Sequence, residues 1–311
     1  MSDPQISAII CTHNREEYLG SAIDSLLEQD FYSYEVIVVD NACNDRTREI
    51  VAERLSNPRL NYVYEPVLGL SVARNTGAKE ALAPLLAYID DDAVASPSWL
   101  KAIYNAFSNN EKLVIAGGKV TLLLPNGITL PPWLSPEQRT TLGAYDLGET
   151  IVKINNLQLS PRGLNYSLRR TFLEEMGGFN VKLGRIGKKL LSNEELHLTQ
   201  MAIQAGWQVA YLPDAVVAHN VAPERLEPLW FLNRGWWQGV SECYCEQLSG
   251  RASPAQLLWG SERMVSGLYK SLKSFSTPAL CFNNLVYAYS QIGYLNAAIQ
   301  GMFNSTQSLK K

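Results

Sequence analysis

The chain has 311 residues, of which 46% are hydrophobic and 18% are charged, a composition that excludes a disordered or low-complexity protein. The formal net charge of −3 speaks against a nucleic-acid partner, because phosphate binding by counterion release needs a basic surface. The 5 cysteines form no CxxC pair, which speaks against a disulfide framework or a zinc site and favours a reducing compartment.

The sequence shows no signal for export or for a membrane span. The N-terminal MSDPQ is acidic and is followed by only a short apolar run, so we expect no export signal and a cytoplasmic protein. Residues 274–309 contain no Asp, Glu, Lys, Arg or His. Their Asn, Gln and Ser content argues against a bilayer-crossing helix, so we expect a buried or surface-docking helix there.

Strand and helix patterns alternate over the first third of the chain. We expect strands at Ile6–Cys11, Tyr34–Asp40, Leu60–Tyr64 and Leu85–Asp90. Each strand is followed by a helical pattern. Apolar spacing over 19–27 indicates the first helix, and the others are expected to begin at Asn44 or Asp45 (reaching Leu55), at Ser71 (to about Leu82) and at Ser96-Pro97 (to about Phe107). This order predicts an α/β fold with a mostly parallel sheet flanked by helices.

The second part of the chain changes character. Residues 113–170 read as short strands and Pro/Gly-rich loops, with an ordered loop at Leu122–Gln138. A helix over Asn193–Gly206 and a strand at Trp207–Leu212 follow. After Pro223 the chain reads as helical, with a break at Thr277-Pro278. We divide it into residues 1–112, 113–222 and a helical C-terminal extension, 223–311.

Polar clusters follow three of the predicted strands. They are Thr12-His13-Asn14, Asp40-Asn41 and Asp90-Asp91-Asp92. Since ligands bind at the carboxyl ends of the strands in such sheets, we expect these clusters to meet at one edge. Three consecutive carboxylates repel one another unless a cation or exposure relieves them, and carboxylates suit Mg²⁺ or Mn²⁺. A solvated acidic turn is the alternative for this triplet.

The order of these motifs resembles a family-two glycosyltransferase with the A-type nucleotide-sugar-binding fold. The resemblance covers about residues 6–220. It rests on IICTHNR, VVDNACND, GLSVARNTG, IDDD, GGFN and NEE, which begin at Ile9, Val38, Gly69, Ile89, Gly177 and Asn193. The resemblance implies an inverting, metal-dependent transfer of one sugar from a nucleotide-sugar donor, with a UDP-sugar favoured, to an acceptor hydroxyl.

By this resemblance the donor binds at the first strand ends, and Asp40 accepts a hydrogen bond from a uracil-like N–H. The other residues implied in nucleotide binding are Thr12, His13, Asn14, Glu16, Arg74, Asn75, Asp90 and Asp91. For Arg74 a structural salt bridge with Asp40 or Asp90 is an equal alternative. Asp92, Asp90 and His219 are implied as ligands of Mn²⁺ or Mg²⁺, although a lone histidine such as His219 is more often a packed residue.

The resemblance also assigns the base and the acceptor side. Glu195 occupies the position of the catalytic Asp, one methylene longer, and Glu194 is the competing candidate. Both acids also suit an ordinary first turn of a helix. Gly178, Phe179 and Asn165 are implied on the acceptor side. Trp236 is a further candidate there, although tryptophans at this spacing more often pack a core.

Other functions remain to be weighed. A nucleotide-sugar-binding protein with impaired catalysis is the alternative that Glu195 keeps open. A dinucleotide-dependent oxidoreductase is disfavoured, because THNREEYLG replaces the glycine-rich phosphate loop after the first strand. The expected acceptor is a glycan or glycolipid of cell-surface polysaccharide synthesis. The uncharged C-terminal helices suggest a homodimer or peripheral docking on the inner face of the plasma membrane, with packing or a dimer preferred because their polar face lacks Lys and Arg.

Overall fold

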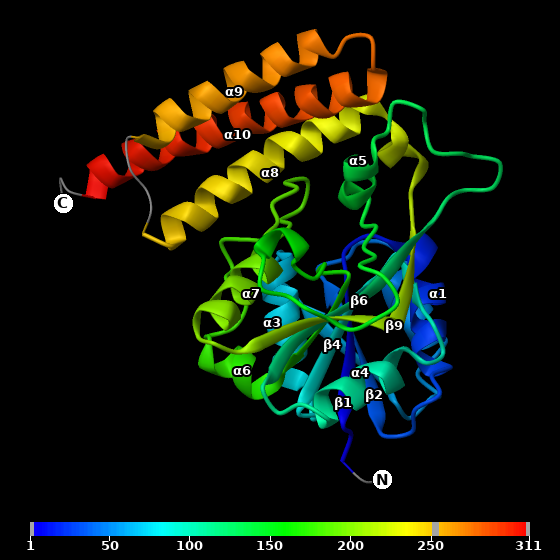
Figure 1. Ribbon diagram of the computed structural model, residues 1–311. Helices are drawn as coiled ribbons and strands as arrows, with labels where there is room; N and C mark the ends of the chain where they lie inside the picture. The colour runs from blue at the N-terminus through cyan, green and yellow to red at the C-terminus, as the bar shows by residue number, and fades with distance from the viewer. Residues whose placement is uncertain (1–2, 251–254, 309–311) are drawn as a thin grey trace. The chain divides into compact units, whose positions relative to one another are not determined.

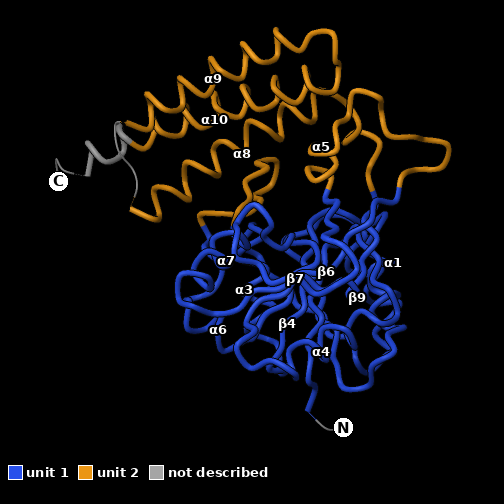
Figure 2. The backbone as a smooth tube through the Cα atoms, viewed as in Figure 1, with its two compact units in different colours: residues 1–123, 143–181, 194–220 blue, residues 124–142, 182–193, 221–311 orange. Residues whose placement is uncertain are grey.

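The chain forms two compact units in a computed structural model that describes residues 3–250 and 255–308. Figure 2 shows unit 1, residues 1–123, 143–181 and 194–220, and unit 2, residues 124–142, 182–193 and 221–311. The division at residues 112 and 222 that we drew from the sequence stays a prediction.

Unit 1 is built on one mixed sheet flanked by helices, as the sequence predicted (Figure 1). In the described part of the chain its strands lie in the order β3-β2-β1-β4-β8-β6-β9-β5, with β7 paired to β9. The strands are β1 Ile6–Thr12, β2 Tyr34–Asn41, β3 Leu60–Glu65, β4 Leu85–Asp90, β5 Ala93–Ala95, β6 Leu113–Leu123, β7 Val152–Lys153, β8 Asn165–Arg169 and β9 Gln208–Asn220. Strands β3, β2, β1 and β4 are parallel, while β8 is antiparallel to both of its neighbours.

The inner parallel strands β1, β2 and β4 form because their sequences are largely apolar on both faces. Every residue of β2, YEVIVVDN, is buried, and so is nearly all of β1, ISAIICT. Such runs suit a strand that is covered by helices on both sides. Strand β9 is longer than the expected Trp207–Leu212, because residues beyond Leu212 continue to pair with β6 and also pair with β5.

The helices of unit 1 confirm the expected pattern but not every predicted boundary. They are α1 Glu16–Leu27, α2 Thr47–Ala52, α3 Leu70–Glu80, α4 Trp99–Ser108, α6 Arg170–Glu175 and α7 Glu194–Gln204, with a 3₁₀ turn at Leu157–Leu159. The prediction that α2 reaches Leu55 is wrong, since that side chain is exposed beyond the helix end. Ser71 and Ser96 are not N-caps, because α3 begins after Gly69 and α4 begins at Trp99.

Unit 2 consists largely of helices. They are α5 Pro136–Thr141, a 3₁₀ turn at Pro223–Leu226, α8 Pro228–Leu248, α9 Ala255–Lys273 and α10 Pro278–Ser308. The start of α5 at Pro136 corrects the predicted loop, and the break before Pro278 is confirmed. In Figure 1, α10 lies beside both α8 and α9. Among the described residues, no helix has the length and hydropathy required to cross a bilayer.

Candidate active site

The carboxyl ends of β1, β2 and β4 bring the predicted polar clusters together. In the sheet register Thr12 lies opposite Asp40, and Cys11 lies opposite Asp90. Thr12, Asp40, Asp91 and Asp92 are all buried. The prediction that these clusters converge on one edge of the sheet is therefore confirmed.

Hydrogen bonds join the loops that follow β1 and β2 at this edge of the sheet. Asn14 Oδ1 accepts a hydrogen bond from the backbone N–H of Asn44 at 2.8 Å, and Glu16 Oε2 accepts one from Arg46 at 2.8 Å. Asp45 in turn accepts from the N–H groups of Glu16 at 3.1 Å and Thr47 at 3.1 Å. These bonds hold the starts of α1 and α2, so they give Asn14 and Glu16 a role in shaping the loops, which the sequence did not indicate.

Two of the three non-glycine residues with positive φ in the described part of the chain lie in the same two loops, and the third, Asn193, directly precedes α7. Asn14 has φ 53° and Ala42 has φ 55°, the left-handed region that alanine rarely adopts. Residues held in such conformations tend to cluster at functional sites, where the surrounding structure fixes them. The loop hydrogen bonds described above supply that constraint.

His13 and Asn41 form hydrogen bonds that fix the backbone at this edge of the sheet. His13 Nδ1 lies 2.8 Å from the carbonyl oxygen of Asn41, which requires Nδ1 to be the donor. The Asn41 side chain donates to the carbonyls of Glu65 at 3.2 Å and Val67 at 2.8 Å, and accepts from Gly69 N–H at 2.8 Å. Asn41 thus positions the start of α3, a role that its place in the predicted Asp40-Asn41 cluster did not indicate.

Asp40 is held as an oriented acceptor. Its Oδ1 accepts from Cys43 N–H at 2.9 Å, and its Oδ2 accepts from the Tyr62 hydroxyl at 2.6 Å. Burial and the bond to Asp40 raise the pKa of Tyr62, which keeps this phenol protonated as a donor. Tyr62 was missed because its role depends on the pairing of β2 with β3, which no local pattern of the sequence shows.

Asp92 and His219 meet where β5 pairs with β9. Ala93 lies opposite His219 in the register, and this places His219 Nε2 at 3.2 Å from Asp92 Oδ1. Arg15 Nη2 lies 3.7 Å from Asp92 Oδ2, an approach that sequence reasoning did not anticipate. Burial, together with the neighbouring Asp92 carboxylate, raises the pKa of Asp91 to about 7. His219 therefore lies within the strand and against the acidic triplet.

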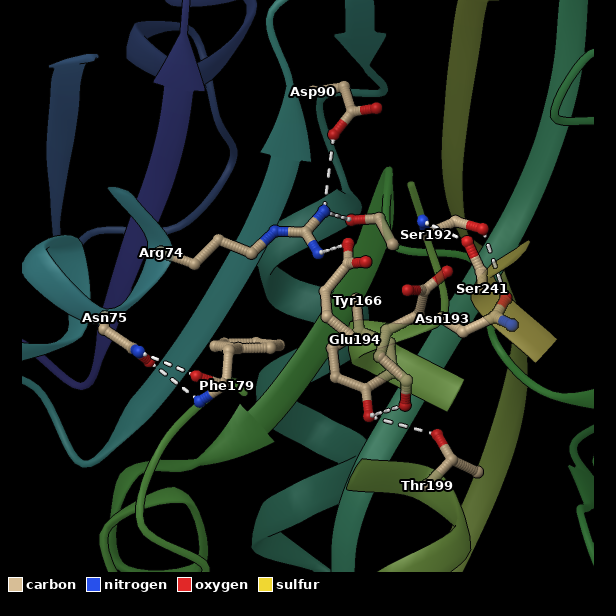
Figure 3. Close-up of polar contacts among 12 residues, drawn as sticks. Arg74, Asn75, Asp90, Tyr166, Phe179, Ser192, Asn193, Glu194, Thr199 and Ser241 are labelled. Carbon is tan, nitrogen blue, oxygen red and sulfur yellow. Dashed lines mark hydrogen bonds and ion pairs between the residues drawn. The ribbon is translucent and has the colours of Figure 1, made fainter. Parts of the chain in front are cut away.

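Asp90 faces a different partner from its neighbours in the triplet. Figure 3 shows Arg74 between Asp90 and Glu194, with Nη1 2.6 Å from Glu194 Oε1 and Nη2 3.6 Å from Asp90 Oδ1. Arg74 Nη2 also donates to the Gly163 carbonyl at 3.0 Å. Of the two salt bridges considered for Arg74, the structure forms the one with Asp90. The buried guanidinium thus forms its contacts within the protein, and these contacts link α3, β4 and α7.

Phe179 and Asn75 support this arginine. The Arg74 guanidinium lies 5.5 Å from the centre of the buried Phe179 ring. The Asn75 side chain clamps the Phe179 backbone through two hydrogen bonds of 2.8 and 2.9 Å. Gly178 has φ 87°, and a Cβ there would lie 2.9 Å from Asn75 Oδ1. The GGFN segment that we expected beside the acceptor is therefore fixed by α3.

Glu195 differs from Glu194 in its surroundings. Its backbone carbonyl accepts a hydrogen bond from the Tyr166 hydroxyl at 3.2 Å, and Tyr166 in turn lies 3.1 Å from Thr199 Oγ1. The Oε2 atom of Glu195 is buried and has no hydrogen-bond partner among the described residues. Among the described residues, Glu194 is thus ion-paired with Arg74, whereas Glu195 forms no ion pair.

Asn165 and Trp236, which we expected at the acceptor, have structural contacts within the protein. The Asn165 amide donates to the Ala215 carbonyl at 2.8 Å and accepts from Trp99 Nε1 at 2.9 Å. Its buried polar atoms join strands of the sheet, which argues against acceptor contact. Trp236 belongs to α8 of unit 2, with its ring 5.9 Å from that of Tyr289. It packs against the helical core of that unit, in line with the packing role we preferred.

The described residues contain no group of three or more His, Cys, Asp and Glu side chains placed to hold a metal ion. Asp92 and His219 form a pair, and Asp90 turns to Arg74. One carboxylate and one imidazole are donors that suit Mn²⁺, with phosphate oxygens completing the shell. The pair therefore fits a metal held jointly by the protein and a bound diphosphate.

Comparison with known proteins agrees with this geometry. The family described as "Glycosyl transferase family 2" matches residues 7–142. The Glucosyl-dolichyl phosphate glucuronosyltransferase of Haloferax volcanii is 27% identical over 278 residues, which cover 87% of this chain and 86% of the relative.

Solved structures extend the likeness over nearly the whole chain. The mannosyltransferase PcManGT from Pyrobaculum calidifontis, in complex with GDP-Man and Mn²⁺, is 18% identical with a TM-score of 0.59, covering 99% of this chain and 76% of that one. S. aureus TarS in complex with UDP is 19% identical with a TM-score of 0.54, covering 96% and 92%. The fold is thus that of the A-type glycosyltransferases. Together with the sequence matches, it identifies the chain as a glycosyltransferase, of which residues 7–142 resemble glycosyl transferase family 2.

Proposed function

We propose that the chain transfers one sugar from a UDP-linked donor to an acceptor hydroxyl, with inversion at the anomeric carbon. Inversion follows from a single in-line displacement, which needs one general base and no covalent nucleophile. Glu195 is that base.

The contrast between the two glutamates of α7 carries this proposal. Glu194 Oε1 lies 2.6 Å from the guanidinium of Arg74, so this carboxylate is already engaged in a buried ion pair. Glu195 Oε2 is buried without a hydrogen-bond partner among the described residues. An oxygen without a partner in the protein is open to the hydroxyl group of an acceptor sugar, whose proton a base must take.

Donor binding is proposed at the edge formed by β1, β2 and β4. Asp40, fixed by Tyr62 and Cys43, accepts from the imide N–H of a uracil. Asp92 and His219 would hold Mn²⁺ or Mg²⁺ together with the diphosphate, and such an ion neutralises the charge of the leaving nucleoside diphosphate. Arg15, beside Asp92, adds a positive charge on the same side.

The acceptor is proposed to be a glycan or a glycolipid of cell-surface polysaccharide synthesis, on the cytoplasmic side of the membrane. The relative from Haloferax volcanii has a glucosyl-dolichyl phosphate in its name, and this supports a lipid-linked sugar as one class of acceptor.

A donor panel tests the proposal. UDP-, GDP- and dTDP-sugars are incubated with the protein and Mn²⁺, Mg²⁺ or EDTA, and release of the nucleoside diphosphate is measured with and without lipid-linked sugar acceptors. We expect release from UDP-sugars that depends on the metal and increases with an acceptor. Release from GDP-sugars alone would refute the role of Asp40, and equal release in EDTA would refute the metal.

A further inference from the structure

Helix α9 of unit 2 turns its small side chains inward. Gly260, Gly267 and Ser271 are buried, and they follow one another at intervals of 7 and 4 residues, which puts them on one face of the helix. A Cβ at Gly267 would lie 3.0 Å from Ala288 Cβ, and one at Gly260 would lie 2.8 Å from Leu295. The two helices α9 and α10 therefore pack closely through this face (Figure 1).

The opposite face of α9 is apolar as well, and it is exposed. Leu258, Val265, Tyr269 and Leu272 are 69%, 60%, 63% and 76% exposed. Their spacing of 7, 4 and 3 residues places them in one stripe along the helix. Phe275, directly after the helix, is also exposed. We call these five residues the α9 stripe.

This arrangement reverses the usual order for a helix in water. An amphipathic helix of a water-soluble protein buries its large apolar side chains and exposes polar ones. Here the large side chains of the stripe are outside, while α10 approaches closely at Gly260 and Gly267 and leaves room there for only small residues. A contiguous exposed apolar surface of this kind marks a site of interaction.

The charges beside the stripe are mostly positive. Within the described residues of α9, Arg263, Lys270 and Lys273 are exposed. Glu262 is the one acidic residue, and its spacing from Leu258 and Val265 places it on the face of the stripe. Trp259, half exposed on the same helix, is of the type that prefers the boundary between lipid and water. Apolar, aromatic and basic side chains on one helix match the surface of an anionic bilayer.

We propose that α9 binds a membrane surface that contains anionic phospholipid, lying along it with the stripe inserted among the acyl chains and the basic residues at the headgroups. The preference for a dimer rests on the lack of Lys and Arg in residues 274–309 and does not extend to α9, which carries Arg263, Lys270 and Lys273. A second copy is the less suitable occupant here, because two α9 helices would bring surfaces of the same net positive charge together. This docking surface lies outside the catalytic residues, so it stands or falls independently of the proposed reaction.

Vesicle flotation tests the proposal without donor or acceptor. The full chain is mixed with vesicles of phosphatidylcholine alone or of phosphatidylcholine and phosphatidylglycerol in equal parts, and the floating fraction is measured at low and high salt. We expect flotation with the anionic vesicles, less with the neutral ones, and a decrease with salt. The paired substitution Val265→Ser and Leu272→Ser should weaken binding about tenfold or more, since two aliphatic side chains no longer enter the lipid.

Two controls keep the test specific. Leu82→Ser removes a leucine that is 68% exposed in unit 1 and should bind as the unaltered chain does. Lys270→Gln with Lys273→Gln should reduce binding only to the anionic vesicles. Flotation that is unchanged by the Val265/Leu272 pair, or no flotation at all, overturns the proposal. A dimer in sedimentation that this pair dissociates, with no vesicle binding, assigns the stripe to a second copy and also overturns it.

Discussion

Replacing Arg74 by alanine tests the buried ion-pair network that separates Glu194 from Glu195. The side chains of Arg74 and Glu194 are 3% and 4% exposed, and their charged atoms lie 2.6 Å apart. Arg74→Ala removes the Arg74 cation from the buried Glu194 carboxylate, and it also removes a bond to Gly163 and an ion pair with Asp90. Breaking a buried pair from one side costs about 3–5 kcal/mol.

The partner substitution gives the matched comparison. Glu194→Gln removes one charge but keeps an amide oxygen for the guanidinium, and Arg74 retains Asp90 and Gly163. We therefore expect a smaller loss of about 1–2 kcal/mol. The double variant should lose less than the sum of the two, with a coupling energy of about 2 kcal/mol.

Urea unfolding followed by tryptophan fluorescence measures these free energies. In thermal melts we expect Arg74→Ala to lower the melting temperature by roughly 5–8 °C, from an unfolding entropy of about 2.1 cal/mol/K per residue over 311 residues. A loss below about 1 kcal/mol for Arg74→Ala, or strict additivity in the double variant, would refute the reasoning, because the guanidinium would then not be compensating the buried carboxylate.

The remaining predictions concern chemistry, backbone strain and pH. Glu195→Gln should retain donor binding in calorimetry but lower the transfer rate about 100-fold or more, since the amide accepts no proton. Asp92→Ala should weaken Mn²⁺-dependent donor binding about tenfold or more in the same calorimetry, because one ligand is lost. Ala42→Gly should raise the free energy of unfolding by up to about 1 kcal/mol in urea, since φ 55° strains alanine and not glycine. Burial, with a contribution from Glu246, raises the pKa of Glu242, so the stability it provides is present below the unfolded pKa of about 4.3 and is lost as the pH rises through the folded pKa. Glu242→Gln should therefore flatten the melting temperature between pH 4 and pH 7, measured as a pH series.

For each of these predictions, one result would contradict the reasoning. Transfer by Glu195→Gln at the rate of the unaltered chain would exclude Glu195 as the base, and normal metal-dependent binding by Asp92→Ala would exclude Asp92 as a ligand. A less stable Ala42→Gly would mean that the loop needs the methyl group more than it suffers from the strain. The same pH dependence in Glu242→Gln would assign that dependence to other groups around it, of which Arg263 and Arg234 are the cations.

The sequence alone predicted the parallel strands and the edge of the sheet at which the candidate site lies. Continuous apolar runs such as Tyr34–Asp40 can be buried only between two layers of helices, and polar residues directly after them must meet at one edge of a parallel sheet. For this reason the convergence of the clusters at Thr12, Asp40 and Asp90 could be predicted before any tertiary contact was known. Helix boundaries were less well predicted, because Ser71 and Ser96 are good caps in isolation but lie where the backbone does not start a helix.

Only the tertiary structure decided which partner each polar side chain takes. Asp90 and Asp92 are two residues apart, yet one faces Arg74 of α3 and the other faces His219 of β9. The Tyr62 hydroxyl donates to Asp40, and the Asn165 amide donates to the Ala215 carbonyl. Both hydrogen bonds depend on pairings between segments that are far apart in the sequence. Local spacing fixes which residues share an edge or a face, but hydrogen bonds and ion pairs form over about 3–4 Å, and that proximity is set by how distant strands and helices pack.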